Sequence, residues 1–210
     1  MLLDKRTAKA NGIVQAAVLL FGKKGYAFTS VEEIAAAAGV GKSTVYDYYK
    51  NKEALFKAAV ISAAERKLSD LKAITSSTDD PLERMKRITE MYLASDRSEC
   101  SGLSKLFVEV LSQTQLQGGV FFNQRHMIQK VYQRMIRTVL DLLLEGVSMR
   151  KLRPDIARHA EMITINFFAF LDGLTMQSMI AGDHIDMREQ AGLYLEQLKD
   201  ILLPGQGIGT

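Results

Sequence analysis

Cysteine, proline and tryptophan are scarce in this chain, whose 210 residues include one Cys, three Pro and no Trp. The single Cys100 excludes a framework of intrachain disulfides and is consistent with a reducing compartment. Val, Ile and Thr nowhere alternate convincingly at the period of a strand. No apolar run approaches the roughly 20 residues that span a bilayer, and the N-terminus lacks the apolar core of a signal peptide. The sequence therefore predicts an all-α protein of the cytoplasm without a membrane partner.

The chain also lacks a recognisable catalytic or metal-binding set. His126, His159 and His184 do not have the spacing of metal ligands. Neither a Ser/His/Asp arrangement nor a Cys/His arrangement is evident. We therefore expect no enzyme activity, no metal and no cofactor.

Residues 30–49 have the spacing of a helix-turn-helix. Ala35 stands where the two helices would cross, and a larger side chain there would force them apart. Gly39 would end the first helix in the left-handed conformation that glycine adopts cheaply, and Val45 would point from the second helix into the first. A second helix held in this way can enter the major groove of DNA.

The pattern from Gly39 to Thr44 also resembles the end of a phosphate-binding loop. That loop needs an earlier glycine where this chain has Ala36, and it needs a preceding strand. Ser30 and Glu33 instead form a capping-box pattern, which predicts a helix start. A nucleotide-hydrolysing enzyme that uses Lys42 is therefore a weak alternative.

Apolar periodicity and capping patterns predict about nine helices. Seven are expected at about residues 4–24, 31–38, 42–48, 51–73, 101–114, 121–149 and 155–181, and two more begin near Pro81 and after Asp186. Positive charge is concentrated at the start, since residues 1–52 hold eight Lys or Arg against four Asp or Glu. Binding to phosphates would require such an excess. We predict a three-helix, DNA-binding head at residues 1–51 and a larger helical bundle at residues 52–210.

A more specific resemblance covers about residues 6–56. It rests on the apolar stripe from Ile13 to Phe21, Gly25-Tyr26, Thr29, the run from Ile34 to Val40, and the run from Lys42 to Phe56. These features together resemble the TetR family of bacterial transcriptional regulators. Two positions depart from the family pattern: Gly41 stands where a serine often caps the second helix, and Ser43 stands where glycine is common.

The resemblance implies a ligand-responsive regulator, most simply a repressor released from its operator by a small molecule. The expected DNA contacts are Thr29, Lys42, Ser43, Thr44, Tyr46, Asp47, Tyr48 and Lys52. Lys42 can bond either a guanine edge or a phosphate, and the sequence leaves both open. The alternative is a helical module that binds small molecules and has lost DNA binding, a reading that only the departures at Gly41 and Ser43 favour.

The C-terminal bundle would hold the effector and join two chains. By resemblance, the effector pocket would be lined by Met85, Met91, Tyr92, Phe107, Met127, Met135, Phe167 and Phe168. Methionine adapts to varied apolar ligands, so we expect a lipophilic compound such as a fatty-acyl or aromatic molecule. A two-fold DNA operator requires a homodimer, and the resemblance places its interface at Gly173, Met176, Met179, Ile180, Leu195 and Leu198.

Overall fold

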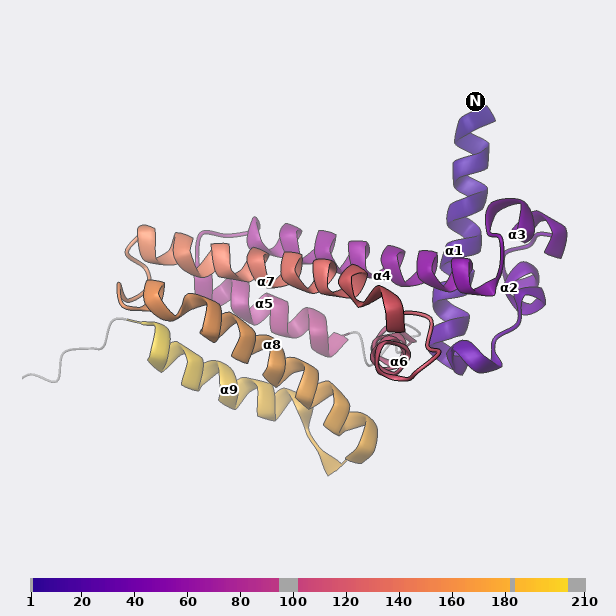
Figure 1. The fold of residues 1–210 in the computed structure, drawn as a ribbon. Helices are drawn as coiled ribbons and strands as arrows, with labels where there is room; N and C mark the ends of the chain where they lie inside the picture. Colours follow the sequence, from indigo (N-terminus) through magenta and orange to yellow (C-terminus); the bar gives the residue numbers. More distant parts are fainter. Residues whose placement is uncertain (1, 95–101, 182–183, 204–210) are drawn as a thin grey trace, which may run out of the picture. The chain divides into compact units, whose positions relative to one another are not determined.

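The structure, a computed structural model, describes residues 2–94, 102–181 and 184–203, and in those ranges it consists of helices joined by short turns and loops (Figure 1). The helices are α1 (Leu2–Phe28), α2 (Val31–Ala37), α3 (Lys42–Tyr48), α4 (Lys52–Thr75), α5 (Pro81–Ala94), α6 (Gly102–Gln115), α7 (Arg125–Ser148), α8 (Ile156–Ala181) and α9 (Met187–Leu202), with a short 3₁₀ helix, η2 (Phe122–Gln124). No strand occurs among the described residues. The all-α prediction is confirmed. Cys100 lies outside the described residues.

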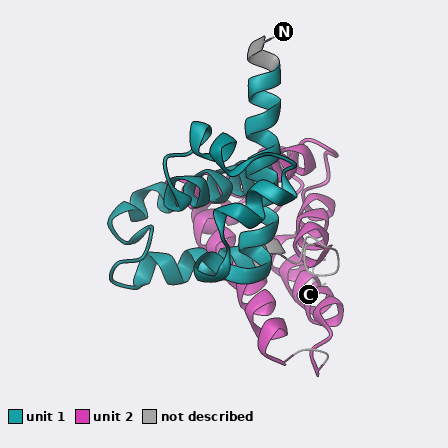
Figure 2. Cartoon of the chain, turned by 90° about the vertical axis from the view of Figure 1, so that its right-hand side faces the viewer, with its two compact units in different colours: residues 1–67, 97–129 teal, residues 68–96, 130–210 magenta. Residues whose placement is uncertain are grey.

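The chain forms two compact units (Figure 2). Unit 1 contains residues 1–67 and 97–129, and unit 2 contains residues 68–96 and 130–210. Helices α4 and α7 each begin in unit 1 and continue into unit 2. These units follow packing, and the functional division between residues 51 and 52 stays a prediction.

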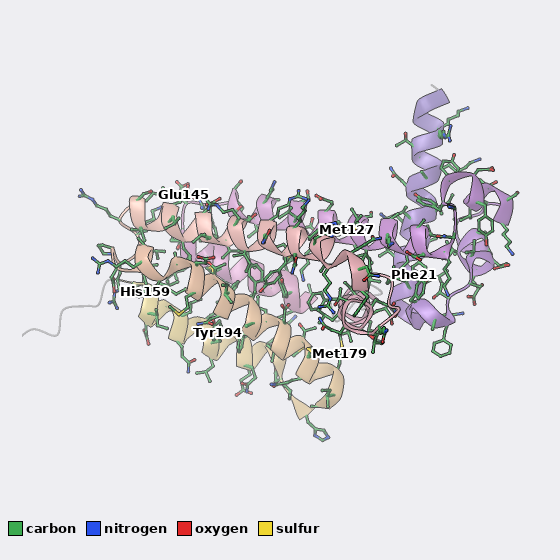
Figure 3. The ribbon with its side chains drawn as sticks, in the orientation of Figure 1. Phe21, Met127, Glu145, His159, Met179 and Tyr194 are labelled. Atoms are coloured by element: carbon green, nitrogen blue, oxygen red, sulfur yellow. The ribbon has the colours of Figure 1, made fainter. Side chains whose placement is uncertain are left out.

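Aromatic rings form the centre of unit 1, where α1 packs on α6 and α2. The ring of Phe21, labelled in Figure 3, meets that of Phe56 edge-on with centroids 4.9 Å apart, and Phe121 lies 5.7 Å from Phe56. All three side chains are fully buried. Ile13 and Ala17 of the predicted stripe are also fully buried, so α1 turns the expected face inward.

The turn between α2 and α3 has the geometry that the sequence predicts. Gly39 adopts a left-handed conformation with φ of 66°. Its N–H donates to the carbonyl of Ala36 at 3.1 Å, and the N–H of Val40 donates to that of Ala35 at 2.9 Å. This pair of bonds is the Schellman motif, which satisfies the last carbonyls of a helix. Ala35 and Val45 are buried where α2 meets α3.

The start of α2 is held by a reciprocal cap. The backbone N–H of Glu33 donates to the Ser30 hydroxyl at 3.2 Å, and the N–H of Ser30 donates to the Glu33 carboxylate at 2.9 Å. This is the predicted capping box. Lys24 of α1 forms an ion pair with the same carboxylate. The hydrogen bond from Lys24, followed by those from Ser30, lowers the pKa of Glu33 from 4.5 to about 2.

Unit 2 is built around α8, which packs against α5 and α9. Phe167 and Phe168 of α8 are buried in one cluster with Met85 of α5. The Tyr194 ring of α9 (Figure 3) stacks on Phe170 with centroids 3.9 Å apart. These rings bury a large area and fix how α8 and α9 pack on each other.

Helix α8 is long and apolar enough, by length and composition alone, to cross a membrane. This differs from the prediction that no apolar run is long enough to span a bilayer. Between residues 162 and 181 its only charged residue is Asp172. Seven of its residues are buried inside unit 2, among them Thr164 and Leu171. We interpret α8 as the core helix of this unit.

The left-handed turn predicts opposite effects for two glycines that both have open space around them. An added Cβ would contact nothing within 4 Å at either Gly39 or Gly12. Gly39→Ala should lower the free energy of unfolding by about 1–2 kcal/mol because of its backbone conformation. Gly12→Ala, in the interior of α1, should raise it by roughly 0.5–1 kcal/mol. Urea denaturation of both variants measures the difference, and equal effects would contradict this account of the turn.

The lowered pKa of Glu33 predicts a stability change in acid. Its carboxylate stabilises the folded state fully above pH 4.5, and that contribution is lost as the pH falls toward about 2. Glu33→Gln keeps a capping side chain but removes the titration. Its melting temperature should therefore fall less steeply across this pH window than that of the wild type. The difference should shrink in 1 M salt because the groups are exposed, and parallel curves at low salt would refute the prediction.

Candidate functional site

Helix α3 presents a polar outer face because one side of it is fixed in the core. Val45 is 1% exposed, whereas Lys42, Ser43, Tyr46 and Asp47 are exposed. The structure thus brings together four of the predicted DNA contacts on one short helix. Thr44 and Tyr48 are half-buried beside them. Gly41 caps α3 without a side-chain hydrogen bond, as the departure from serine predicts.

Lys42, the first residue of α3, is paired with Glu32 in the first turn of α2. Its Nζ also lies 5.9 Å from the centre of the Tyr46 ring. The hydrogen bond between Lys42 and Glu32 lowers the pKa of Glu32 and raises that of Lys42. Glu32 was not among the predicted site residues, since no periodicity relates residues across a helix-turn-helix.

The basic start of α1 reaches the predicted DNA-binding face at Tyr48. The Arg6 guanidinium carbon lies 5.6 Å from the centre of the Tyr48 ring, a cation–π contact. Lys5 and Lys9 are exposed on either side of Arg6. Tyr49 caps the C-terminal end of α3 and is half-buried, with its N–H donating to the carbonyl of Val45 at 2.9 Å. Arg6 was missing from the predicted contacts, although its position in the basic segment was a usable signal.

Thr29 and Lys52 both bond to backbone carbonyls of α1. Thr29 is 2% exposed, and its hydroxyl lies 2.8 Å from the carbonyl of Gly25 and 3.2 Å from that of Leu20. That hydroxyl points into the protein, so we leave Thr29 out of the DNA contacts that we propose below. Lys52 donates to the carbonyl of Ala27 at 3.2 Å, and partial burial lowers the pKa of its ammonium group.

The predicted effector residues fall into two groups. Six belong to unit 2, where Met85, Tyr92, Phe167 and Phe168 are buried in one core and Met91 and Met135 pack against it. Phe107 and Met127 belong to unit 1 and are half-buried there. The prediction of a single effector pocket therefore rests on the six residues of unit 2.

A polar group interrupts the apolar core of unit 2. The Tyr92 ring is buried with its centroid 6.0 Å from that of Phe168. Burial and then the charge of Asp172 raise the pKa of Tyr92, and the same two causes raise that of Tyr132. Asp172 was not among the predicted residues, although a lone charge in an apolar helix was visible in the sequence.

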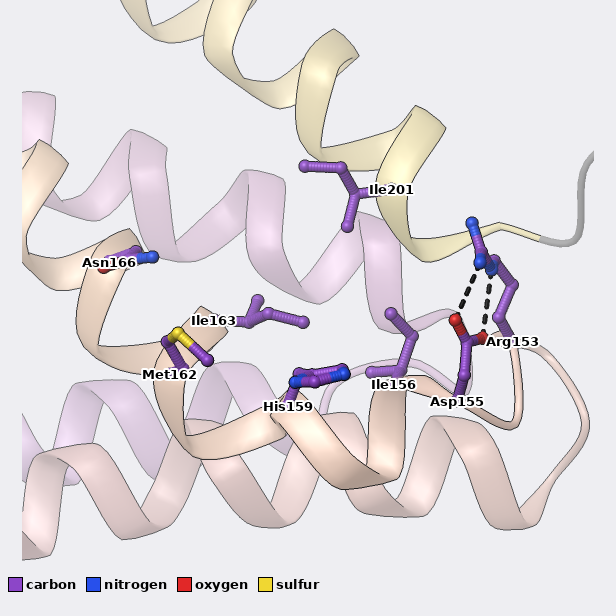
Figure 4. Close-up of a pocket in the computed structure, with 8 residues that line it drawn as sticks. All are labelled: Arg153, Asp155, Ile156, His159, Met162, Ile163, Asn166 and Ile201. Atoms are coloured by element: carbon purple, nitrogen blue, oxygen red, sulfur yellow. Dashed lines mark hydrogen bonds and ion pairs between the residues drawn. The ribbon is translucent and has the colours of Figure 1, made fainter.

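A hollow of about 220 Å³ lies where the start of α8 faces the end of α9 (Figure 4). Arg153 and Asp155 form a two-bond ion pair at its rim, at 3.0 and 2.7 Å. Its other lining residues are Ile156, His159, Met162, Ile163, Asn166 and Ile201. A second hollow, of about 640 Å³, is polar and includes the buried Arg84 and its ion-pair partner Glu145. Neither hollow is lined by a predicted effector residue.

The predicted dimer residues differ in what they can offer a partner chain. Met176, Met179 and Ile180 are exposed, Leu195 is half-buried, and an added Cβ at Gly173 would contact nothing within 4 Å. Leu198 instead lies in the core of its own unit. Its place in the α9 stripe does not tell which neighbour the stripe packs against. Other apolar side chains that α8 and α9 expose are Met162, Ile165, Leu193 and Ile201.

Among the described residues, no three His, Cys, Asp or Glu side chains gather as metal ligands would.

Comparison with known proteins agrees with this geometry at the N-terminal end. Residues 13–59 match the family described as bacterial regulatory proteins, tetR family. The helix-turn-helix transcriptional regulator YerO of Bacillus subtilis (strain 168) is 41% identical over 51 residues. That match covers 24% of this chain and only 18% of YerO, so it concerns the head alone.

Solved structures resemble the chain over nearly its whole length. A transcriptional regulator from Saccharomonospora viridis, solved with choline, has a TM-score of 0.79 at 16% identity and covers 95% of this chain and 100% of its own. The regulator FadR from Bacillus subtilis, solved with stearoyl-CoA, has a TM-score of 0.70 at 19% identity and covers 89% and 96%. At these identities the likeness establishes the fold. The match over residues 13–59 shows that this chain carries the N-terminal domain described as bacterial regulatory proteins, tetR family.

Proposed function

We propose that this regulator is a repressor that binds a two-fold DNA operator as a homodimer and is released by a lipophilic small molecule. The observation that carries the proposal is the outer face of α3, where Lys42, Ser43, Tyr46 and Asp47 are exposed while Val45 fixes the helix from behind. A helix presented in this way fits the major groove. Because the operator is part of the bacterial chromosome, the protein would act in the cytoplasm and needs neither a cofactor nor catalytic activity.

Phosphate contacts would surround the base-reading helix. Tyr48 lies at its end, Lys52 begins α4, and Arg6 adds a charge from α1. Such contacts position a protein on the duplex, whereas groove contacts by Lys42 or Thr44 carry the sequence information. The excess of basic residues in the first 52 positions supports this arrangement.

The exposed apolar side chains of α8 and α9 support the proposed dimer. Met176 and Met179 are spaced one helical turn apart and are 43% and 38% exposed. Contiguous apolar surface on a soluble domain marks a contact with another protein. A C₂ dimer through this face would present two recognition helices with the symmetry of an operator.

The six soft and aromatic residues of unit 2 support an apolar effector. Met91 and Met135 are half-buried at the edge of the buried aromatic cluster, and methionine side chains rearrange readily around a ligand. The two similar structures were solved with stearoyl-CoA and with choline, which shows how widely ligands differ on this fold. The proposal of a lipophilic effector therefore rests on the side chains of this chain.

Release requires the effector to favour a conformation that binds DNA poorly. Shifting a two-state equilibrium from 1:99 to 99:1 takes about 10⁴-fold differential affinity, or about 5.5 kcal/mol. Helix α4 begins beside the DNA-binding head and continues into unit 2, so we propose it as the element that couples the two.

Selection of duplexes from a random DNA pool tests the proposed DNA binding. We expect enrichment of a two-fold sequence whose half-sites are about 34–36 Å apart or a multiple of it. Affinity should fall steeply with salt. Lys42→Ala should weaken binding to the selected operator about 10-fold or more, whereas Lys130→Ala, on exposed α7 surface, should not.

Release from DNA is tested by measuring the affinity of the protein for the same operator while stearoyl-CoA is added. Choline serves as a polar comparison. Lower operator affinity in the lipophilic ligand alone would support the proposed class. Unchanged affinity in both at saturation would count against it. If no sequence is enriched and DNA affinity does not depend on salt, the chain is instead a helical small-molecule-binding module.

Two charges placed on the exposed face should break the dimer. Met176→Glu combined with Met179→Glu would bury unpaired carboxylates at the interface, which costs several kcal/mol. Light scattering should then report the mass of one chain with the helical content unchanged. Leu19→Glu, at an apolar residue of unit 1 that is 55% exposed, is the matched control and should leave the dimer intact. A dimeric double variant would exclude this face.

A further inference from the structure

The ammonium group of Lys42 is held from two sides before any DNA is present. Glu32, in the first turn of α2, forms an ion pair with it, and the Tyr46 ring centre lies 5.9 Å from its Nζ. The Lys42 side chain is 51% exposed and that of Glu32 is 57% exposed. Both groups therefore face the solvent together, and whatever approaches Lys42 along the outer face of α3 also approaches the Glu32 carboxylate.

This pairing changes which DNA group Lys42 can bind. An ammonium group has three N–H donors, so one bond to Glu32 leaves two for a partner. A phosphate placed on these donors would bring its negative charge close to the carboxylate, and like charges at such distances repel. The edge of guanine is uncharged and offers two acceptors, O6 and N7. The guanine edge can therefore join the pair without that repulsion.

We infer that Glu32 directs Lys42 to a guanine of the operator rather than to the phosphate backbone. The inference rests on the proposed function and adds to it a specificity determinant outside the recognition helix. Glu32 would act through Lys42, by its charge and by holding the ammonium group in place. Its carboxylate would also weaken contact with unrelated DNA, where phosphates are the main attraction.

Glu32→Gln tests this because it keeps the shape of the side chain and removes its charge. The matched control is Glu33→Gln, which makes the same change in net charge one residue away. Glu33 pairs with Lys24 and not with Lys42, and glutamine can serve its capping role. Circular dichroism and melting curves at pH 7 establish that both variants are folded.

The measurements are affinities for the selected operator, for operators with each single base pair replaced, and for an unrelated duplex of the same length. In the wild type, replacing the guanine that faces Lys42 should weaken binding about 5- to 150-fold. Glu32→Gln should reduce that penalty, bind the unrelated duplex more tightly and steepen the salt dependence by about 0.9, the slope of one added phosphate contact. Glu33→Gln should keep the full guanine penalty.

Lys42→Ala completes the test. It should remove the guanine preference, and adding Glu32→Gln to it should change base preference no further. Equal guanine penalties in Glu32→Gln and the wild type, or an operator in which no guanine preference depends on Lys42, would overturn the inference while leaving the repressor function intact. If the wild-type protein enriches no DNA sequence, the proposed function and this inference both fall.

Discussion

The packing of α2 against α3 is the contact on which the rest of the head depends. A helix of seven residues has too few internal hydrogen bonds to be stable in water by itself. α3 is held by Val45, which is buried on the side where Ala35 of α2 approaches. The left-handed turn at Gly39 sets the direction in which the chain leaves α2. Once these are in place, Lys42, Ser43, Tyr46 and Asp47 of α3 face outward.

Local patterns and the helix-turn-helix spacing predicted several features of the head, whereas most side-chain contacts between separate helices could not be predicted. The capping box at Ser30, the turn at Gly39 and the inward side of α1 each follow from a local pattern of a few residues. The pairing of Lys42 with Glu32 arises only when α2 and α3 meet. The inward hydroxyl of Thr29 follows from its bonds to the carbonyls of Gly25 and Leu20 near the end of α1. Leu198 was predicted at the dimer interface but lies in the core of its own unit. An apolar stripe on a helix predicts that the face is buried, but it does not identify the element that packs against it.

The positive charge of the head is less free than its composition suggests. Lys24 is bound to Glu33, Lys42 to Glu32, and Lys52 to the carbonyl of Ala27. Each ammonium group is thereby fixed in place before a ligand arrives, which reduces the conformational entropy lost on binding. Exposed pairs of this kind contribute little to folding because water and salt screen them. Their importance lies in where they hold the charges.

Asp172 has a consequence for how the chain is made in the cell. By length and composition alone, α8 is apolar enough to cross a bilayer, and this residue is the one charge between positions 162 and 181. A carboxylate near the middle of such a segment raises the free energy of insertion by about 2.5–3.5 kcal/mol. The same side chain that acts on Tyr92 in the folded core thus also biases the newborn polypeptide toward release into water and away from lipid.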